Sequence, residues 1–384
     1  MSTRRRKGAA KPRHAGLGER LEGKRIVICA GSGGVGKTTT AARPIAIAAA
    51  GGARVAVVTI DPAKRLADAL GLDHLDNDPA LVDPARFTKA GVEIRGELWA
   101  MTLDPKRTFD ELVDRLSEDD AARDEILENR IYQQLSGAVA GSQEFTAVAK
   151  LYDLNASGRF DVLVLDTPPS RNALDFLDAP DRLTSFLEGR ALKVFLAPTG
   201  LAARVVGRGT GVVFSVLQRL TGVDLLEDLS VFFRALGGLL DGFRERAEGV
   251  KRLLADDATT FVVVTSPERE PVEEAIFFAG KLREAKMRFG ALIVNRVHSL
   301  GEPGERLPDP TRVAAQLAPE LGDKLASKVA RTYGEALGIA TRDDAAIQWL
   351  REETGDQDPV IVPELEGDVH DVAGLVAVHS HLFA

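Results

Sequence analysis

The feature that most constrains this chain is a glycine-rich segment, Gly31 to Thr38, which has the sequence G-S-G-G-V-G-K-T. It follows the apolar run Arg25 to Ala30, which predicts a buried strand. The pattern G-x-x-x-x-G-K-[ST] between a strand and a helix is typical of a loop that wraps phosphates, because its glycines let backbone N–H groups point inward. A glycine-rich turn that binds nothing is the alternative, but the flanking strand and Ala-rich helix favour the phosphate loop. The sequence therefore predicts that the chain binds a nucleotide.

The same pattern predicts a task for individual residues of the loop. Lys37 is expected to reach the β- and γ-phosphates, and the Thr38 hydroxyl to ligate Mg²⁺. The residues expected to hold the phosphates are Gly33, Gly34, Val35, Gly36, Lys37, Thr38 and Thr39.

Two further apolar runs end in a carboxylate. Arg54 to Ile60 is followed by Asp61, and Phe160 to Leu165 is followed by Asp166. In open α/β sheets ligands bind at the carboxyl ends of the strands, and phosphoryl transfer needs a metal shell and a water in line with the γ-phosphate. Asp166 suits the metal and Asp61 suits the water. A strand-end Asp that only caps the next helix is the alternative for either residue.

The apolar runs together predict an α/β chain. They are short, continuous and rich in β-branched residues, as expected for parallel strands buried on both faces. We expect a P-loop NTPase fold with a mostly parallel, twisted sheet and helices on both faces. The expected strands are Arg25–Ala30, Arg54–Ile60, Glu97–Leu103, Phe160–Asp166, Thr260–Thr265, Ala291–Asn295 and Val360–Val362.

Two stretches are longer than a crossover between strands requires, at about 104–158 and about 183–254. Both have apolar residues at helical spacing and are expected to form a helical insertion subdomain within an ATPase domain of residues 23–384. Residues 1–22 are basic and lack an apolar core, which predicts a disordered tail and no signal peptide.

Composition limits the partners. The formal net charge is −8 and the pI is about 5.5, which gives no reason to expect nucleic acid. No apolar run reaches the roughly 18 residues that a bilayer span requires, so membrane contact is expected to be peripheral at most. The single cysteine, Cys29, lies in the first strand and is expected to be a buried core residue in a reducing, cytoplasmic compartment.

The motifs together resemble the ArsA-type ATPases. G-G-V-G-K-T-T, then D-P-A-x-x-L-x-D-A from Asp61, then D-T-P-P-S from Asp166 are similar to this family, which holds arsenite-pump ATPases and the guided-entry ATPases for tail-anchored proteins. Leu292 to Arg296 and Val360 to Glu364 resemble its two adenine-binding segments. The motifs extend from about Arg25 to about Leu375, which is nearly the whole chain.

The resemblance implies a dimeric, Mg²⁺-dependent ATPase whose cofactors are ATP and Mg²⁺. It implies that Lys37, Asp61 and Asp166 are catalytic and that Asn295 and Pro363 hold adenine. In the guided-entry enzymes the second insertion forms an apolar groove for a client's transmembrane helix. In this chain the same apolar faces could instead pack on each other.

The chain departs from the family at Ser32, where the motif normally has a lysine that reaches the partner's phosphates across a dimer. A serine hydroxyl carries no charge and cannot neutralise the developing negative charge. Either a homodimer hydrolyses slowly, or the chain pairs with a lysine-bearing relative, which is the hypothesis we favour. With one cysteine, no arsenite site and no C-x-x-C zinc clasp are expected.

Three classes of function follow. The first is an ATPase whose closure on ATP creates a surface for a client or partner protein. The second is a partitioning or positioning ATPase, which would need a basic face that residues 368–384 do not supply. The third is a weakly hydrolysing, nucleotide-gated subunit of a heterodimer.

Overall fold

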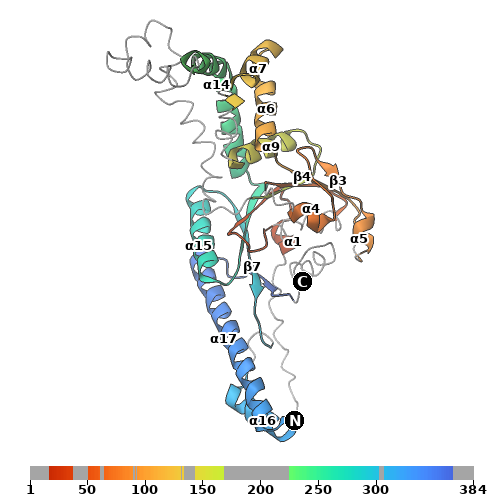
Figure 1. Cartoon of the computed structure of the whole chain (residues 1–384), viewed down its shortest axis with the longest axis vertical. Helices are drawn as coiled ribbons and strands as arrows, with labels where there is room; N and C mark the ends of the chain where they lie inside the picture. Colours follow the sequence, from red (N-terminus) through yellow and green to blue (C-terminus); the bar gives the residue numbers. More distant parts are fainter. Residues whose placement is uncertain are drawn as a thin grey trace, which may run out of the picture.

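The fold is built on one central sheet. The computed structural model describes residues 17–37, 51–60, 65–89, 91, 93–130, 132–133, 143–167, 225–301 and 307–365. Within these residues the sheet has eight strands in the order β3-β4-β2-β5-β1-β6-β7-β8 (Figure 1). Every pair of neighbours is parallel except β3 with β4. The predicted mostly parallel α/β sheet is thereby confirmed.

Seven of the strands coincide with the predicted apolar runs. Their central residues are buried on both faces, which explains why continuous β-branched runs were needed there. The strands are β1 Ile26–Gly31, β2 Arg54–Thr59, β4 Glu97–Thr102, β5 Val162–Asp166, β6 Thr259–Thr265, β7 Phe289–Val297 and β8 Val360–Pro363. The remaining strand, β3 Ala80–Leu81, was not predicted, because it is a two-residue antiparallel edge strand with both residues exposed.

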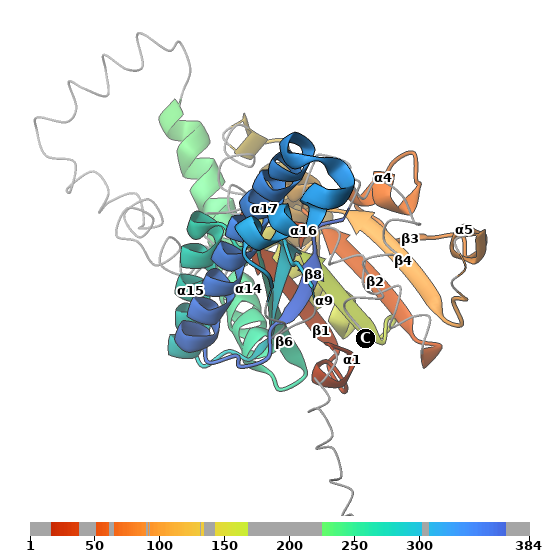
Figure 2. The same ribbon diagram turned by 90° about the horizontal axis from the view of Figure 1, so that it is seen from below.

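Helices cover both faces of the sheet, as Figure 2 shows. One core contains alternate residues of β1, such as Ile26 and Ile28, packed with side chains of α9, α14, α15 and α17. The other contains Val27 and Cys29 packed with α1, α4 and α5. The buried position predicted for Cys29 is therefore confirmed. The helices are α1 Leu17–Arg20, α4 Arg65–Leu70, α5 Ala85–Lys89, α6 Pro105–Leu116, α7 Asp120–Leu127, α9 Gln143–Ala156, α14 Leu225–Ala255, α15 Arg269–Glu284, α16 Pro310–Leu321 and α17 Asp323–Thr354.

The helices α6, α7 and α9 lie in the first stretch that was predicted to be an insertion, and α14 lies at the end of the second. Residues 183–224 of the second stretch lie outside the described residues, so the subdomain and its boundaries stay a prediction. No helix among the described residues is long and apolar enough to cross a membrane.

A helical hairpin, α16–α17, extends away from the sheet (Figure 1). Pro310 opens α16 after the N-cap Asp309, whose side chain accepts a hydrogen bond from Thr311 N–H. Gly322, with φ +72°, makes the turn between the two helices. A Cβ at Gly334 of α17 would lie 3.2 Å from Pro310 Cγ, so the two helices approach closely there.

The end of the predicted basic tail is a correction. Residues 17–22 were assigned to a disordered segment, but Leu17–Arg20 forms α1, and Leu17 and Leu21 are buried. Two kinds of contact anchor this segment on the sheet. The two leucines are part of the hydrophobic core, and Arg20 forms a salt bridge with Asp356 at 2.9 Å. Asp356 also accepts the backbone N–H of Leu292 in β7 at 3.1 Å. Residues 1–16 lie outside the described residues.

This anchor yields a test of stability. Asp356→Ala removes the acceptor for both Arg20 and the Leu292 N–H, so we expect it to lower the free energy of unfolding by about 2–3 kcal/mol. Asp358→Ala is the matched control, because its carboxylate is more exposed and lies 3.6 Å from Arg20; we expect a loss below about 1 kcal/mol. Urea unfolding of the two variants measures both values, and equal losses would contradict the anchor.

Candidate functional site

Strand pairing brings several predicted residues to one edge of the sheet. The phosphate loop follows β1, Asp166 ends β5, and Asn295 and Pro363 lie near the ends of β7 and β8. These strands are parallel, so their carboxyl ends share an edge. Thr38, Thr39 and Asp61 lie outside the described residues, and their roles stay predictions.

The phosphate loop depends on its glycines. Gly34 and Gly36 have φ values of +77° and +91°, which L-residues with side chains rarely adopt. A Cβ at Gly36 would lie 2.4 Å from Asn295 Nδ2, and a Cβ at Gly31 would lie 2.0 Å from the Val264 carbonyl oxygen in β6. The loop therefore brings bare backbone close to its neighbours, as a phosphate-binding loop must.

Lys37 is held against the loop that it is expected to serve. Its side chain is only 6% exposed. Its ammonium donates to the carbonyl oxygens of Gly31 at 2.9 Å and Ser32 at 2.6 Å. Carbonyl oxygens are weaker partners for an ammonium than phosphate oxygens are, because hydrogen bonds between two ionised groups are stronger. A phosphate that enters the loop would therefore replace these carbonyl oxygens as the partner of Lys37 at a gain in free energy.

Asp166 is buried between the two central strands that flank β5. It pairs in register with Cys29 of β1 and Thr59 of β2. Its Oδ2 accepts a hydrogen bond from the Thr59 hydroxyl at 3.2 Å. In the sequence, Thr59 counts only as a strand residue, and the only signal for its role is its position near the carboxyl end of the predicted strand Arg54–Ile60.

Asn295 connects the last strands to the phosphate loop. Its Nδ2 donates to the Val35 carbonyl at 2.9 Å. The β7–β8 register shifts between Val294 and Val297, and Arg296 has φ +60°. An extra residue of this kind bends a strand and redirects a side chain. The bulge is what turns Asn295 toward the loop.

A residue of α17, Asp343, forms two contacts with the residue that follows this bulge. The buried Asp343 accepts the His298 backbone N–H at 2.8 Å and lies 3.0 Å from His298 Nδ1. No motif in the sequence pointed to Asp343, because its partner is 45 residues away. We regard it as a positioning residue for the segment that carries Asn295.

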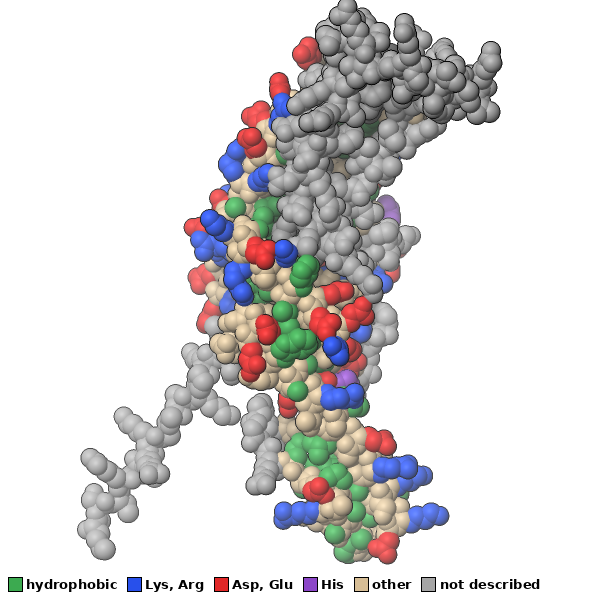
Figure 3. Space-filling model, turned by 90° about the vertical axis from the view of Figure 1, so that its left-hand side faces the viewer, with side chains coloured by type: hydrophobic (Ala, Val, Ile, Leu, Met, Phe, Trp, Pro, Cys, Tyr) green, Lys and Arg blue, Asp and Glu red, His purple; other side chains and the backbone are tan. Residues whose placement is uncertain are grey.

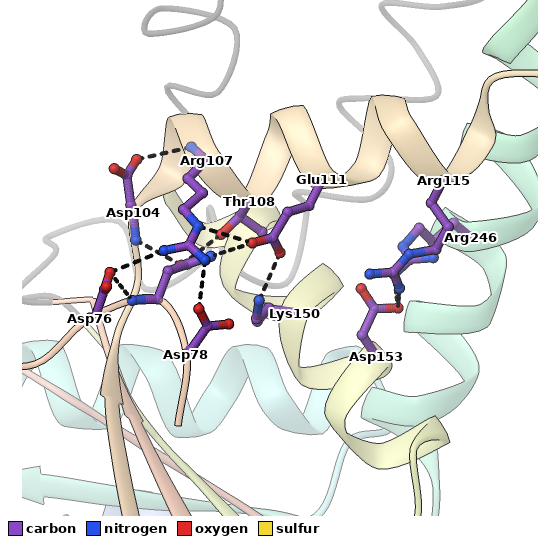
Figure 4. A network of polar contacts seen from close by, with 11 residues as sticks. Asp76, Asp78, Asp104, Arg107, Thr108, Glu111, Arg115, Lys150, Asp153 and Arg246 are labelled. Atoms are coloured by element: carbon purple, nitrogen blue, oxygen red, sulfur yellow. Dashed lines mark hydrogen bonds and ion pairs between the residues drawn. The ribbon is translucent and has the colours of Figure 1, made fainter. Parts of the chain in front are cut away.

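A partly buried polar network joins the carboxyl edge of the sheet to helices α6 and α9 (Figure 4). Asn77, fully buried, donates to Glu111 of α6 at 3.0 Å and accepts from the Asp104 N–H and the Thr108 hydroxyl. Glu111 in turn pairs with Lys150 of α9 at 2.8 Å. The backbone beside this network meets β2, because Leu103 N–H donates to the Thr59 carbonyl at 2.9 Å.

A second cluster joins three insertion helices. Arg115 of α6 lies 2.7 Å from Asp153 of α9, and Arg246 of α14 pairs with the same carboxylate (Figure 4). Burial, followed by the positive charge of Arg115, lowers the pKa of Arg246 to about 10. Arg246 therefore remains charged at neutral pH, and Asp153 is the common counter-ion that keeps the three helices together.

Comparisons with known proteins identify similar ATPases. The model of the anion-transporting ATPase family matches residues 24–305. The chain is 27% identical over 274 residues to ATPase GET3 of Malassezia globosa, which covers 71% of this chain and 72% of the relative. It is also 27% identical over 281 residues to ATPase GET3A of Arabidopsis thaliana, covering 72% and 68%. For ATPase ARSA2 of Chlamydomonas reinhardtii the identity is 27% over 290 residues, covering 74% and 71%.

The polar network predicts that substitutions at the neighbouring residues Asn77 and Asp78 change the free energy of unfolding by different amounts. Asn77→Ala would remove three hydrogen bonds and leave the buried Thr108 hydroxyl without this acceptor, so we expect a loss of about 2–3 kcal/mol in the free energy of unfolding. Asp78→Ala is the control, because its pair with Arg107 is exposed, and we expect a change below about 1 kcal/mol. Thermal or urea unfolding distinguishes them, and a larger loss for the Asp78 variant would refute the assignment.

The bulge predicts a specific loss of nucleotide affinity. Asn295→Ala removes one hydrogen bond to the phosphate loop, so we expect ATP binding to weaken about tenfold. Arg296→Gly, in the same bulge, relieves a positive φ and removes an exposed side chain, so ATP affinity should not change. Isothermal titration with ATP measures both. Unchanged binding by the Asn295 variant would show that the side chain does not serve the site.

Proposed function

The chain belongs to the anion-transporting ATPase family and is an ATPase, and from this premise we propose that it works as an Mg²⁺-dependent dimer in which ATP drives closure around a client or partner protein. The observation that carries the proposal is the meeting of the phosphate loop, Asp166 and Asn295 at one edge of the sheet. This edge is where ligands bind in open α/β sheets.

Each group has a task in this proposal. The loop N–H groups and Lys37 hold the phosphates, and Asn295 and Pro363 hold the adenine. Asp61 orients the attacking water. Thr38 and Asp166 would hold Mg²⁺, which neutralises charge on the β- and γ-phosphates when bound. Two features fit this set: the buried carboxylate of Asp166 at a strand end, and a loop with no room for a Cβ at Gly36.

The polar network supplies a route from the nucleotide to the insertion helices. A change at the end of β2 reaches α6 through Leu103 and Asn77, and reaches α9 through Glu111 and Lys150. Closure requires that ATP contact two conformations differently, which switch carboxylates at the strand ends would provide. The helices are thus suited to present a surface whose shape depends on the nucleotide.

Ser32 favours a heterodimer over a homodimer. Its backbone carbonyl accepts from Lys37, but its side chain brings no positive charge to a partner's phosphates. A partner chain that carries lysine at this position would supply the charge to the site built by Lys37 of this chain. In this arrangement the present chain alone binds ATP and hydrolyses it slowly.

The test measures Mg²⁺-ATP turnover by the purified chain over rising protein concentration, with Lys37→Ala as the blank. We expect ATP binding with little turnover for the natural chain. Ser32→Lys should raise specific activity at least about tenfold at high concentration, because one charge on the transferring phosphoryl group is worth that much or more.

Two outcomes would decide against parts of the proposal. Turnover by the natural chain that rises with concentration and disappears in Lys37→Ala would mean a competent homodimer, and the heterodimer hypothesis would fail. Turnover that persists in Lys37→Ala would mean that the phosphate loop is not the catalytic site. Ser32→Ala is the matched control, since it changes the same position without adding charge.

A further inference from the structure

The α16–α17 hairpin exposes large apolar side chains at its far end. Six large hydrophobic side chains are exposed in the described part of the chain, and three of them lie here. They are Leu321 at the end of α16 and Leu325 and Val329 in α17, which are 41%, 49% and 40% exposed. Single exposed apolar residues need no explanation, but three in adjacent turns of one hairpin do.

The hairpin places its small residues inside and its large ones outside. Ala326, Ala330 and Ala340 of α17 are buried, whereas α16 has no buried residue. An alanine contact lets two helices approach closely but removes little apolar area from water. Within the described residues, Leu321, Leu325 and Val329 are therefore left largely open to solvent.

A seam with coiled-coil spacing extends along α17, and its residues are exposed in the first half and half-buried in the second. Residues 325, 329, 332, 336 and 339 follow steps of four and three, which places them on one side of the helix. We call this set the α17 seam; its members are Leu325, Val329, Thr332, Ala336 and Ile339. It is narrow, because Lys324, Lys328 and Arg331 border it on one side and buried residues such as Ala326 and Ala330 border it on the other.

Positive charge flanks the seam. Lys324, Lys328 and Arg331 lie along one side of it, and Glu335 on the same side lies 4.0 Å from Arg331. The whole chain has a formal net charge of −8, so this flank is opposite in sign to the molecule. Figure 3 shows Lys and Arg side chains beside hydrophobic ones at this end of the molecule.

A second copy of the chain, a bilayer surface or a partner helix could cover such a seam. The charge beside the seam and the width of the seam distinguish among these three. A second copy would bring its own basic flank against this one, which like-charge repulsion opposes. A bilayer surface suits a broad apolar face with aromatic or leucine residues, whereas this seam is narrow and has Thr332 in its middle. A helix with an apolar stripe and acidic flanks matches both the spacing and the charge.

We propose that the α16–α17 hairpin docks an amphipathic helix of a partner protein, with Asp or Glu beside its apolar stripe, to form a three-helix coiled coil. The partner helix would cover the α17 seam and Leu321, and its carboxylates would face Lys324 and Lys328. The tip of the hairpin, where α16 ends and α17 begins, extends away from the sheet (Figure 1). The inference therefore does not rest on the proposed dimer or on hydrolysis.

The test uses the full chain and two fluorescent helical peptides, each about four heptads long, with leucine at a and d. One peptide has Glu at e and g and the other has Lys, so that like charges keep each from pairing with itself. Fluorescence anisotropy should show the acidic peptide binding at least about tenfold more tightly than the basic one. Leu325→Gln/Val329→Gln should lower that affinity at least about tenfold, because two apolar contacts are lost.

Charge reversal and a matched control sharpen the result. Lys324→Glu/Lys328→Glu should invert the preference between the peptides. Leu81→Gln changes a leucine of similar exposure, 50%, in β3 and should leave binding unchanged. All variants alter exposed positions, and circular dichroism with thermal unfolding checks that each remains folded.

Several results would overturn the proposal. One is the absence of saturable binding of the acidic peptide in the micromolar range; another is binding that does not discriminate between the peptides. Sedimentation that shows self-association lost in the Leu325/Val329 variant would assign the seam to a second copy. Flotation with phosphatidylglycerol-containing vesicles that is lost in the same variant would assign it to a membrane.

Discussion

The pairing of β1 with β5 on one side and β6 on the other is the constraint on which the site depends. It sets Cys29 against Asp166 and Gly31 against Val264. At Gly31 the backbones are so close that a Cβ would lie 2.0 Å from the Val264 carbonyl. The loop therefore leaves the sheet at a fixed point, with Lys37 folded over the carbonyls of Gly31 and Ser32. A carboxylate from the neighbouring strand is carried to the same edge because the strands are parallel and in register.

Much of this frame could be predicted from the sequence, because buried parallel strands require continuous apolar runs and those runs are local. The position of Asp166 at a strand end followed from the same reasoning, whereas Lys37 was assigned from the phosphate-loop motif and Asn295 from the resemblance to the ArsA-type ATPases. The strand β3 could not be predicted, since two exposed residues carry no pattern. The helix α1 was also missed. Its short sequence has basic and glycine neighbours, and only the core pocket for Leu17 and the carboxylate of Asp356 give it a reason to form.

No sequence pattern indicated the single polar residues whose partners are far away in the chain. Asn77 was one polar residue among several in a loop, yet it is fully buried and joins the backbone before α6 to Glu111. Asp343 was one charged residue in a long helix, yet it holds His298. Periodicity indicates that a helix has an apolar face but not what that face contacts. The sequence therefore could not predict that α16 and α17 extend away from the sheet.

The helix α17 places two separate functions on one element. Its first turns carry the exposed seam, and Asp343, further along, holds the segment from which Asn295 reaches the phosphate loop. Both features lie on one helix of 32 residues, so a docked partner helix would contact the same element that positions Asn295. Proximity along one helix is not coupling, however, because coupling requires an element with two arrangements that both ligands bias. A second arrangement of the segment around Arg296, which has φ +60° and receives both contacts of Asp343, would meet this requirement.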